Sequence, residues 1–302
     1  MHRLIKPRAV APGSTIGLAA PGGPVDPEKF AAGEALLRDA GFRTVHRDDL
    51  FDRRHYLAGD DRRRVDEFMQ FVDDDRIDAI VCARGGYGSE RIIESLDSRR
   101  VRAARKALIG YSDITALLLW QRRCAGLVGF HGPMLDRGSD LDGRAMEMLF
   151  AQLRGEAELP LVLAGTGHGG GQASGRLAGG SLTLVAASIG TRWEIDTHRA
   201  ILLLEDVGER PYRIDRMFQQ LRGAGKLDAV VGVGIGDFSG CRDDRFPDTS
   251  VLDVILEASN RWVYRSSPGC PLDTCVTTPR GPRVGALPST GTAVRSTSSS
   301  TE

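Results

Sequence analysis

A serine in a tight turn is the residue of this chain that looks most like a nucleophile. Ser112 lies in Gly110-Tyr111-Ser112-Asp113, between an apolar run and a helical pattern. A strand that turns sharply into a helix presents the turn residue at the carboxyl edge of a parallel sheet, where such sheets bind ligands. The N–H of Asp113 would then begin a helix and stabilise an oxyanion. On the local pattern alone, a plain helix N-cap is the stronger interpretation of Ser112.

A glycine-rich turn is the second candidate for chemistry. Arg84-Gly85-Gly86-Tyr87-Gly88 follows an apolar strand pattern, and Ser89 is expected to cap the next helix. Glycines allow a backbone to approach a ligand or a neighbouring loop closely, which suits an oxyanion or carboxylate cradle. A nucleotide site and a plain tight turn remain alternatives. The spacing matches neither the dinucleotide fingerprint nor a P-loop.

An acidic stretch and the histidines supply the remaining candidates. Glu205 follows a buried strand in Leu204-Glu205-Asp206-Val207-Gly208-Glu209. A carboxylate at a strand end can orient a histidine in a triad, although ion pairs with nearby arginines are an alternative role. Among the six histidines, His131 follows an apolar segment and is a candidate for the site or for the core. No histidine group has the spacing of a zinc peptidase, so we predict no metal.

Composition excludes several classes of function. Lys plus Arg and Asp plus Glu number 40 each, so no net charge draws the chain to nucleic acid or an anionic membrane. The five cysteines include no C-x-x-C pair, which indicates reduced thiols in the cytoplasm. The sequence shows no signal peptide and no apolar stretch of about 18 residues. We therefore expect a cytoplasmic protein without a membrane span.

Strand and helix patterns alternate through the first 130 residues or so. This alternation predicts an α/β fold whose N-terminal domain is a Rossmann-like layer with a parallel sheet. The predicted strands cover 14–20, 42–46, 78–83 and 107–110, and the predicted helices cover 27–40, 62–74, 89–96 and 114–121.

The second half indicates a smaller C-terminal domain of mixed α/β structure. Its predicted helices cover 182–189 and 212–222, and its predicted strands cover 200–204 and 229–236. We place the N-terminal domain at 1–160, a Gly-rich linker at 161–175, the C-terminal domain at 176–288 and a disordered Ser/Thr-rich tail at 289–302.

Together these segments resemble the LD-carboxypeptidase family, which includes the muramoyltetrapeptide carboxypeptidases and the microcin C immunity peptidases. The segments occur in the family's order over residues 3–265. They are Lys6-Pro7, Ile16-Gly17 with Ala20-Pro21, 83–88, 110–115, His131-Gly132-Pro133, Gly179-Gly180-Ser181-Leu182, 204–209 and 211–216.

The resemblance implies a cytoplasmic serine peptidase of murein recycling that needs no metal or other cofactor. Its substrate would be a murein L,D-tetrapeptide from which it releases D-alanine, and it would be a homodimer. Ser112 would be the nucleophile and Glu205, rather than Glu209, the carboxylate of a Ser–Glu–His triad. The N–H groups of Gly86 and Asp113 would form the oxyanion hole. Arg84 and Tyr87 would lie near the substrate.

The histidine of that triad is missing where the resemblance places it. Arg280, or a residue within two of it, occupies its position before Gly285-Ala286-Leu287-Pro288. An arginine stays protonated and cannot act as a general base. The chain is then a weakened enzyme, or its reading frame has shifted near residues 270–275, or His131 or His168 substitutes. Alternative functions are a non-catalytic murein-peptide binding relative and a microcin C-type immunity peptidase.

Overall fold

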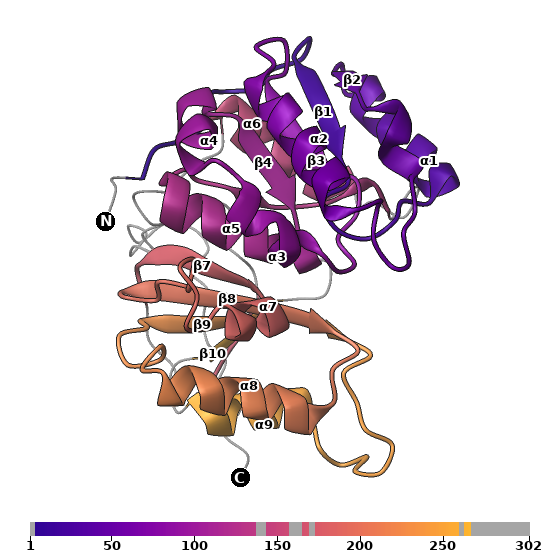
Figure 1. Cartoon of the computed structure of the whole chain (residues 1–302). Helices are drawn as coiled ribbons and strands as arrows, with labels where there is room; N and C mark the ends of the chain where they lie inside the picture. Colours follow the sequence, from indigo (N-terminus) through magenta and orange to yellow (C-terminus); the bar gives the residue numbers. More distant parts are fainter. Residues whose placement is uncertain (1–3, 137–142, 157–164, 169–172, 260–262, 267–302) are drawn as a thin grey trace. The chain divides into compact units, whose positions relative to one another are not determined.

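The computed structural model describes residues 4–136, 143–156, 165–168, 173–259 and 263–266 (Figure 1). These residues divide into two compact units. The first contains residues 4–156 with 190–195, and the second contains 165–189 with 196–266. The predicted tail and the region of Arg280 lie outside the described residues.

The first unit is built on a five-stranded parallel sheet with the order β2-β1-β3-β4-β5. Apolar runs buried on both faces form its central strands, as expected for parallel strands between helix layers. The strands are β1 (Thr15–Ala19), β2 (Arg43–Val45), β3 (Ala79–Cys82), β4 (Ala107–Gly110) and β5 (Phe130–His131).

Helices cover both faces of this sheet. Figure 1 shows α2, α3 and α5 in front of it and α6 behind. Phe30 and Leu37 of α1 share a core with Leu149 and Leu153 of α6, which places α1 and α6 on the same face. The elements are α1 (Pro27–Asp39), η1 (Asp48–Phe51), α2 (Asp61–Asp73), α3 (Ser89–Ile92), η2 (Ile93–Ser95), α4 (Ser98–Ala104), η3 (Ser112–Ile114), α5 (Thr115–Trp120), the π-helical turn η4 (Gln121–Ala125) and α6 (Gly143–Arg154).

Side-chain caps define where several of these helices begin. Asp26 accepts hydrogen bonds from the N–H groups of Glu28 (2.9 Å) and Lys29 (3.2 Å), and Pro27 begins α1. Asp60 accepts one from Arg63 N (2.8 Å) at the start of α2. Such caps satisfy N–H groups that have no partner within the helix. The helix predicted over 27–40 is therefore confirmed.

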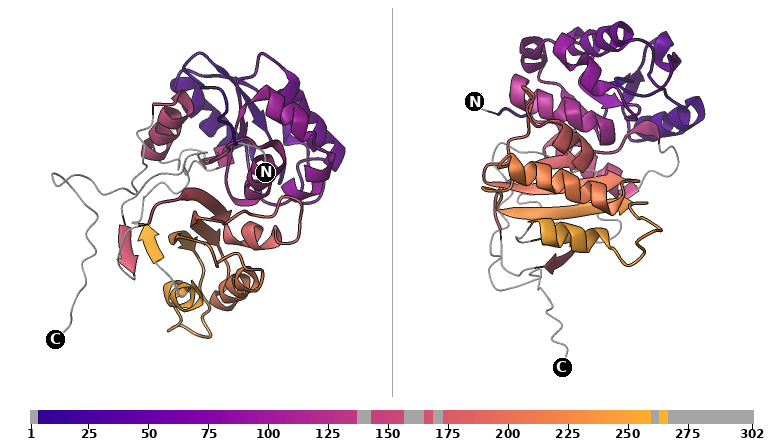
Figure 2. Two further views of the ribbon diagram at one scale, coloured as in Figure 1. Left: turned by 90° about the vertical axis from the view of Figure 1, so that its left-hand side faces the viewer. Right: turned by 60° about the horizontal axis from the view of Figure 1, so that its bottom comes forward.

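The second unit contains a smaller sheet with the order β6-β10-β9-β8-β7, in which β6 and β10 are antiparallel and the other pairs are parallel. Figure 2 shows α8 and α9 side by side next to this sheet. The elements are β6 (Gly165–His168), β7 (Arg176–Ser181), α7 (Leu182–Ala187), β8 (Ala200–Val207), α8 (Pro211–Gly223), β9 (Gly232–Ser239), α9 (Val251–Ser259) and β10 (Val263–Ser266).

The predicted fold class is confirmed, with differences in detail. Residues 165–168, which fall in the stretch that the sequence suggested as a linker, form β6. Strand β7 was missed because Gly179 and Gly180 lie inside it, and β9 begins three residues later than expected. A Cβ at Gly179 would collide with the Leu203 carbonyl oxygen, so this glycine permits close strand pairing. The domain boundaries stay a prediction.

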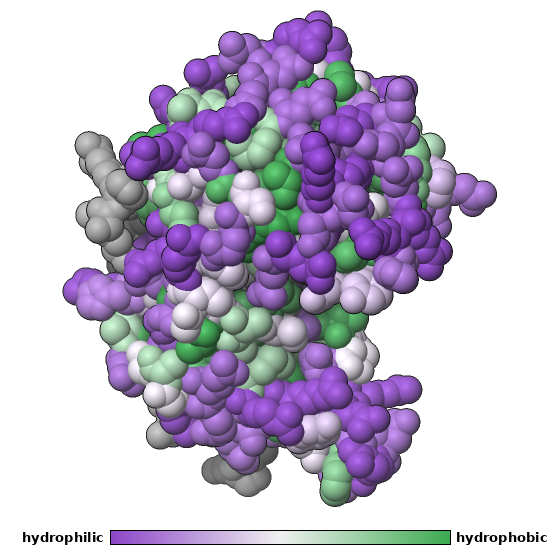
Figure 3. Space-filling model, viewed as in Figure 1, coloured by the Kyte–Doolittle hydropathy of each residue, from purple (hydrophilic) through white to green (hydrophobic). Residues whose placement is uncertain are grey.

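The visible surface is polar on both units. Hydrophilic residues, purple in Figure 3, cover most of the face shown, with apolar residues scattered between them. Isolated exposed apolar side chains are normal for a globular protein. No helix within the described ranges is long and apolar enough to cross a membrane.

Candidate active site

The strand order of the first unit predicts where a ligand binds. From β1 the chain crosses to β2 on one side, and later returns to β3 on the other. In sheets of this order, ligands bind beyond the carboxyl ends of the strands where the direction of winding reverses. The loops at that edge are 20–24 after β1, 84–88 after β3 and 111–113 after β4. Two of them are the turns singled out from the sequence.

Glycines bring these loops into contact. Gly23 N donates a hydrogen bond to the Gly85 carbonyl oxygen (2.7 Å). A Cβ at Gly22 would collide with that oxygen and lie 2.6 Å from Asp113 Oδ2. The turn at residues 21–24, which directly follows the strand predicted over 14–20, is therefore part of the candidate site.

Ser112 lies at this meeting point with a strained backbone. Its φ is +58°, a conformation that costs a residue with a side chain free energy. An N-cap residue normally has extended φ and ψ, so this geometry differs from that of a plain cap. A Cβ at Gly85 would lie 3.3 Å from Ser112 Cβ and 3.2 Å from Asp113 N. The serine side chain, the N–H of Asp113 and the glycine turn are thus immediate neighbours.

Asp113 is buried and joins two of the loops. Its Oδ1 accepts a hydrogen bond from Gly88 N (3.3 Å) and its Oδ2 accepts one from Ser89 N (2.9 Å). Burial raises the pKa of this carboxyl group, and the hydrogen bonds oppose that shift. The expectation that Ser89 caps its own helix is wrong. The cap of α3 is the carboxylate of Asp113, and Ser89 Oγ donates to the Asp113 carbonyl oxygen (2.6 Å).

The other sequence candidates of the glycine turn lie around this point. Gly86 is exposed and has a φ of +79°. Arg84 is half-buried and its Nη1 donates to the Pro24 carbonyl oxygen (2.7 Å), so part of its guanidinium is committed to the neighbouring loop. Tyr87 is 50% exposed and meets Tyr56, 61% exposed, with 5.6 Å between ring centroids. Tyr56 gave no sequence signal.

His131 belongs to the same edge of the sheet. It pairs with Gly110 in the β4–β5 register, and its ring lies 6.2 Å from that of Tyr111, centroid to centroid. Burial lowers the pKa of His131 to about 4. The imidazole is therefore neutral at physiological pH, the protonation state that a general base requires.

Glu205 lies in β8 of the second unit, opposite Ser181 of β7. The β8–β9 register shifts between Leu204 and Asp206, and such irregularities often occur beside active sites. Asp206 is buried, and its Oδ2 accepts hydrogen bonds from Thr183 N and Thr183 Oγ1, both 2.8 Å. Neighbouring strand residues point to opposite faces. Glu205 therefore projects from the face opposite the one that Asp206 uses to hold α7.

The structure brings Ser112, Asp113, Gly86, Arg84 and Tyr87 together in the first unit. Glu205 lies in the second unit and His168 ends β6 there. Arg280 is outside the described residues. Sequence reasoning missed Arg64, whose guanidinium binds two of the loops. The run Arg62-Arg63-Arg64 resembles a solvated helix face, so nothing in the sequence indicated it.

Known proteins share both parts of this chain. Residues 16–132 match the LD-carboxypeptidase N-terminal domain, and residues 174–268 match the LD-carboxypeptidase C-terminal domain. A probable murein peptide carboxypeptidase of Bacillus subtilis strain 168 is 36% identical over 261 residues, which cover 83% of this chain and 81% of that protein. The murein tetrapeptide carboxypeptidase of Pseudomonas aeruginosa is 34% identical over 231 residues, 69% of this chain and 72% of that protein.

A solved structure shares the fold. The microcin C7 self immunity protein MccF in complex with aspartyl sulfamoyl adenosine has a TM-score of 0.79 and 23% identity, covering 87% of this chain and 90% of that chain. Both family domains are thus matched, in their expected order, and the chain belongs to the LD-carboxypeptidase family of peptidases.

Proposed function

We propose that the chain is a serine-type LD-carboxypeptidase that removes a terminal D-alanine from murein L,D-tetrapeptides. It acts in the cytoplasm, in cell-wall recycling, as a homodimer. The observation that carries the proposal is the position of Ser112. It occupies a strained strand-to-helix turn at the edge where sheets of this order bind ligands, directly beside the N–H of Asp113. The names of the murein-peptide relatives support the substrate.

The proposed reaction is an acyl transfer in two steps. Ser112 Oγ attacks the carbonyl carbon of the bond that precedes the terminal D-residue, and its proton passes to a general base. The N–H groups of Gly86 and Asp113 donate hydrogen bonds to the resulting oxyanion. The base then protonates the leaving amine, and water hydrolyses the acyl-enzyme. Glu205 orients the base, and Arg84 and Tyr87 border the substrate.

The proposed activity depends on which residue acts as the general base. If Arg280 stands where the histidine belongs, the chain retains only the part of catalysis that the oxyanion site and substrate binding provide. If His131 substitutes, kcat/KM should fall on the acid side near pH 4, because that is the pKa of its imidazole. A base that titrates with an ordinary histidine pKa would exclude His131.

The direct test is release of D-alanine from an L,D-tetrapeptide by the full chain. Ser112→Ala should abolish release, whereas Ser98→Ala, a serine at the start of α4, should leave it unchanged. Labelling by a fluorophosphonate, located by peptide mass spectrometry, should modify Ser112. Equal activity of Ser112→Ala and the unmodified chain would overturn the nucleophile assignment.

A binding protein without turnover is the second candidate, and Arg280 at the expected histidine position favours it. Calorimetry should then show tetrapeptide binding while no D-alanine appears. The fold shared with MccF adds a second ligand class to test, an aminoacyl sulfamoyl nucleoside. Cleavage of aspartyl sulfamoyl adenosine in preference to tetrapeptide would indicate an immunity-type peptidase.

A further inference from the structure

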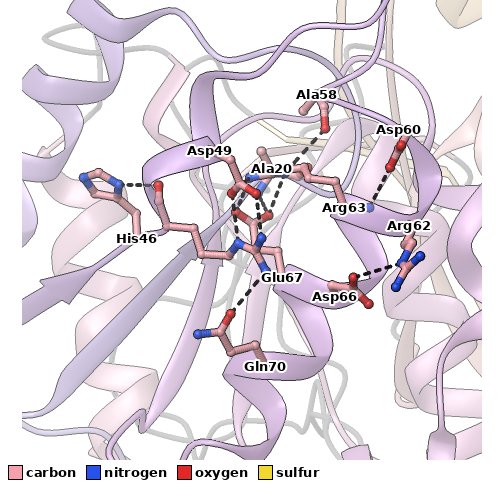
Figure 4. Close-up of polar contacts among 11 residues, drawn as sticks. Ala20, His46, Asp49, Ala58, Asp60, Arg62, Arg63, Asp66, Glu67 and Gln70 are labelled. Carbon is pink, nitrogen blue, oxygen red and sulfur yellow. Dashed lines mark hydrogen bonds and ion pairs between the residues drawn. The ribbon is translucent and has the colours of Figure 1, made fainter.

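Helix α2 sends two neighbouring arginines into the interior of the first unit. Figure 4 shows Arg63 paired with Glu67 close to Ala20, the residue that follows β1. Arg63 Nη2 lies 2.5 Å from Glu67 Oε1, and Glu67 Oε2 accepts a hydrogen bond from Ala20 N (2.7 Å). This pair neutralises its own charges while it holds the backbone at the end of β1.

Arg64 is also buried, but its buried partners differ from those of Arg63. It has no exposed surface, and burial lowers the pKa of its guanidinium. Removing a charged group from water is unfavourable unless strong partners replace the water. Its carboxylate partner, Asp61, is 42% exposed at the side chain and also binds Arg91. The buried partners of Arg64 are instead two backbone carbonyl groups.

Those carbonyl groups belong to two loops of the candidate site. Arg64 Nη1 donates to the carbonyl oxygen of Pro21 (2.6 Å) and to that of Gly88 (2.6 Å). The absence of a side chain at Gly88 leaves room for this guanidinium, because a Cβ there would lie 2.8 Å from Arg64 Nη1. One guanidinium nitrogen therefore joins the loop after β1 to the loop after β3.

The segment between these anchors carries Gly86. At one end, Gly23 N holds the Gly85 carbonyl oxygen at 2.7 Å, and Gly23 lies two residues from the Pro21 that Arg64 binds. At the other end, Arg64 binds the Gly88 carbonyl oxygen while Asp113 Oδ2 accepts from Ser89 N of the same peptide group. Gly86 and Tyr87 span the interval between these two points. Arg64 binds the second point directly, and it binds Pro21 of the loop whose Gly23 N–H makes the first.

We propose that Arg64 is a positioning residue, which fixes the direction of the Gly86 N–H by holding the Pro21 and Gly88 carbonyl groups. This inference rests on the proposed function, in which Gly86 donates to the oxyanion. Arg64 does not itself touch the substrate. Its effect is on kcat, because a misdirected donor weakens stabilisation of the transition state more than binding of the ground state.

The test compares three substitutions of Arg64 with a control on the same helix. Arg64→Lys keeps a charge that can reach the carbonyl groups, Arg64→Gln keeps one neutral donor group, and Arg64→Met keeps none. The control is Arg62→Met, because the Arg62 side chain is 90% exposed and pairs with Asp66 on the outer side of α2 (Figure 4).

Two measurements are made on each full-length variant. Hydrogen–deuterium exchange of residues 85–89 should accelerate at least about tenfold in Arg64→Met, while the peptides of β1, β3 and β4 stay protected. In tetrapeptide hydrolysis, kcat should fall about 10- to 100-fold with KM within about threefold. The kcat of Arg64→Gln should lie between those of Arg64→Met and Arg64→Lys, and Arg64→Lys should keep most of the kcat of the unmodified chain. Arg62→Met should match the unmodified chain.

Several outcomes would overturn the inference. The inference fails if hydrogen–deuterium exchange of residues 85–89 is unchanged in Arg64→Met. It also fails if the unmodified chain is active and Arg64→Met has the same kcat. If Arg64→Met fails to fold, Arg64→Gln takes its place. The inference is then overturned if Arg64→Gln exchanges residues 85–89 as slowly as the unmodified chain and has the same kcat. A chain with Arg64 intact that releases no D-alanine would contradict the proposed function instead. Exchange across the Arg64 series would then decide by itself whether Arg64 holds the loop.

Discussion

Arg64 and Asp113 hold opposite ends of one peptide group, the one between Gly88 and Ser89. The carbonyl oxygen accepts from the guanidinium at 2.6 Å, and the N–H donates to the carboxylate at 2.9 Å. Both charged side chains are buried. A peptide dipole placed between a cation at its oxygen and an anion at its N–H is stabilised at both ends. This arrangement fixes the orientation of the last peptide group of the glycine turn.

The first prediction concerns the carboxylate end of this arrangement. Asp113→Asn replaces one acceptor oxygen by an NH₂ group, which faces an N–H of Gly88 or Ser89. Two donors then oppose each other in a buried site, so the free energy of unfolding should fall by about 1–3 kcal/mol. The kcat for tetrapeptide should fall at least tenfold. Urea unfolding and D-alanine release measure the two effects.

A milder substitution provides the control for Asp113. Ser89→Ala removes the hydroxyl that donates to the Asp113 carbonyl oxygen and leaves the carboxylate contacts intact. It should cost about 1 kcal/mol and change kcat by no more than a few-fold. If Asp113→Asn were as stable as the unmodified chain, the carboxylate would not be the cap of α3.

The second prediction separates stability from activity at Ser112. The left-handed backbone costs a residue with a side chain about 1–2 kcal/mol, whereas the greater freedom of glycine in the unfolded chain costs about 0.5–1 kcal/mol. Ser112→Gly should therefore raise the free energy of unfolding by up to about 1.5 kcal/mol while it abolishes D-alanine release.

Arg199 provides a matched position for this experiment, because its φ is +51°. Arg199→Gly should gain a similar free energy of unfolding and keep full activity. A clear loss of stability in Ser112→Gly would mean that the serine side chain supports the fold, which is the role of a structural residue rather than of a strained nucleophile.

Local sequence patterns predict the buried strands of this fold, but they do not predict the contacts between its loops. Apolar runs such as those of β3 and β4 predict a parallel sheet, because strands covered on both faces bury every residue. The cap of α3 could not be predicted, because Asp113 is 24 residues from Ser89 in the chain. The role of Arg64 could not be predicted either, since its carbonyl partners are 43 and 24 residues away in the chain. Contacts between loops depend on the assembled sheet.

The third prediction concerns stability in mild acid. The pKa of His131 is about 4 in the folded chain, compared with 6.5 for an unperturbed histidine. The unfolded chain therefore binds more protons than the folded chain between these values, so stability is lost as pH falls from 6.5 towards 4. From pH 7 to pH 5 this residue should contribute a loss of about 2 kcal/mol.

Urea unfolding at the two pH values measures this loss. His131→Gln should remove about that much of the pH dependence, and His198→Gln, at an exposed position, should leave it as in the unmodified chain. The same pH dependence in His131→Gln and the unmodified chain would show that folding does not lower the pKa of His131.

The fourth prediction addresses the missing base. If the chain is a weakened enzyme because Arg280 occupies the position of a histidine, a histidine at or beside that position should restore proton transfer to Ser112. One of Thr278→His, Pro279→His and Arg280→His should then raise D-alanine release at least about tenfold, since loss of a triad base costs several orders of magnitude. The same substitution combined with Ser112→Ala should stay inactive, which excludes a contaminating peptidase. Flat activity in all three variants would rule out this position for the base and leave His131 or His168 to be tested in its place.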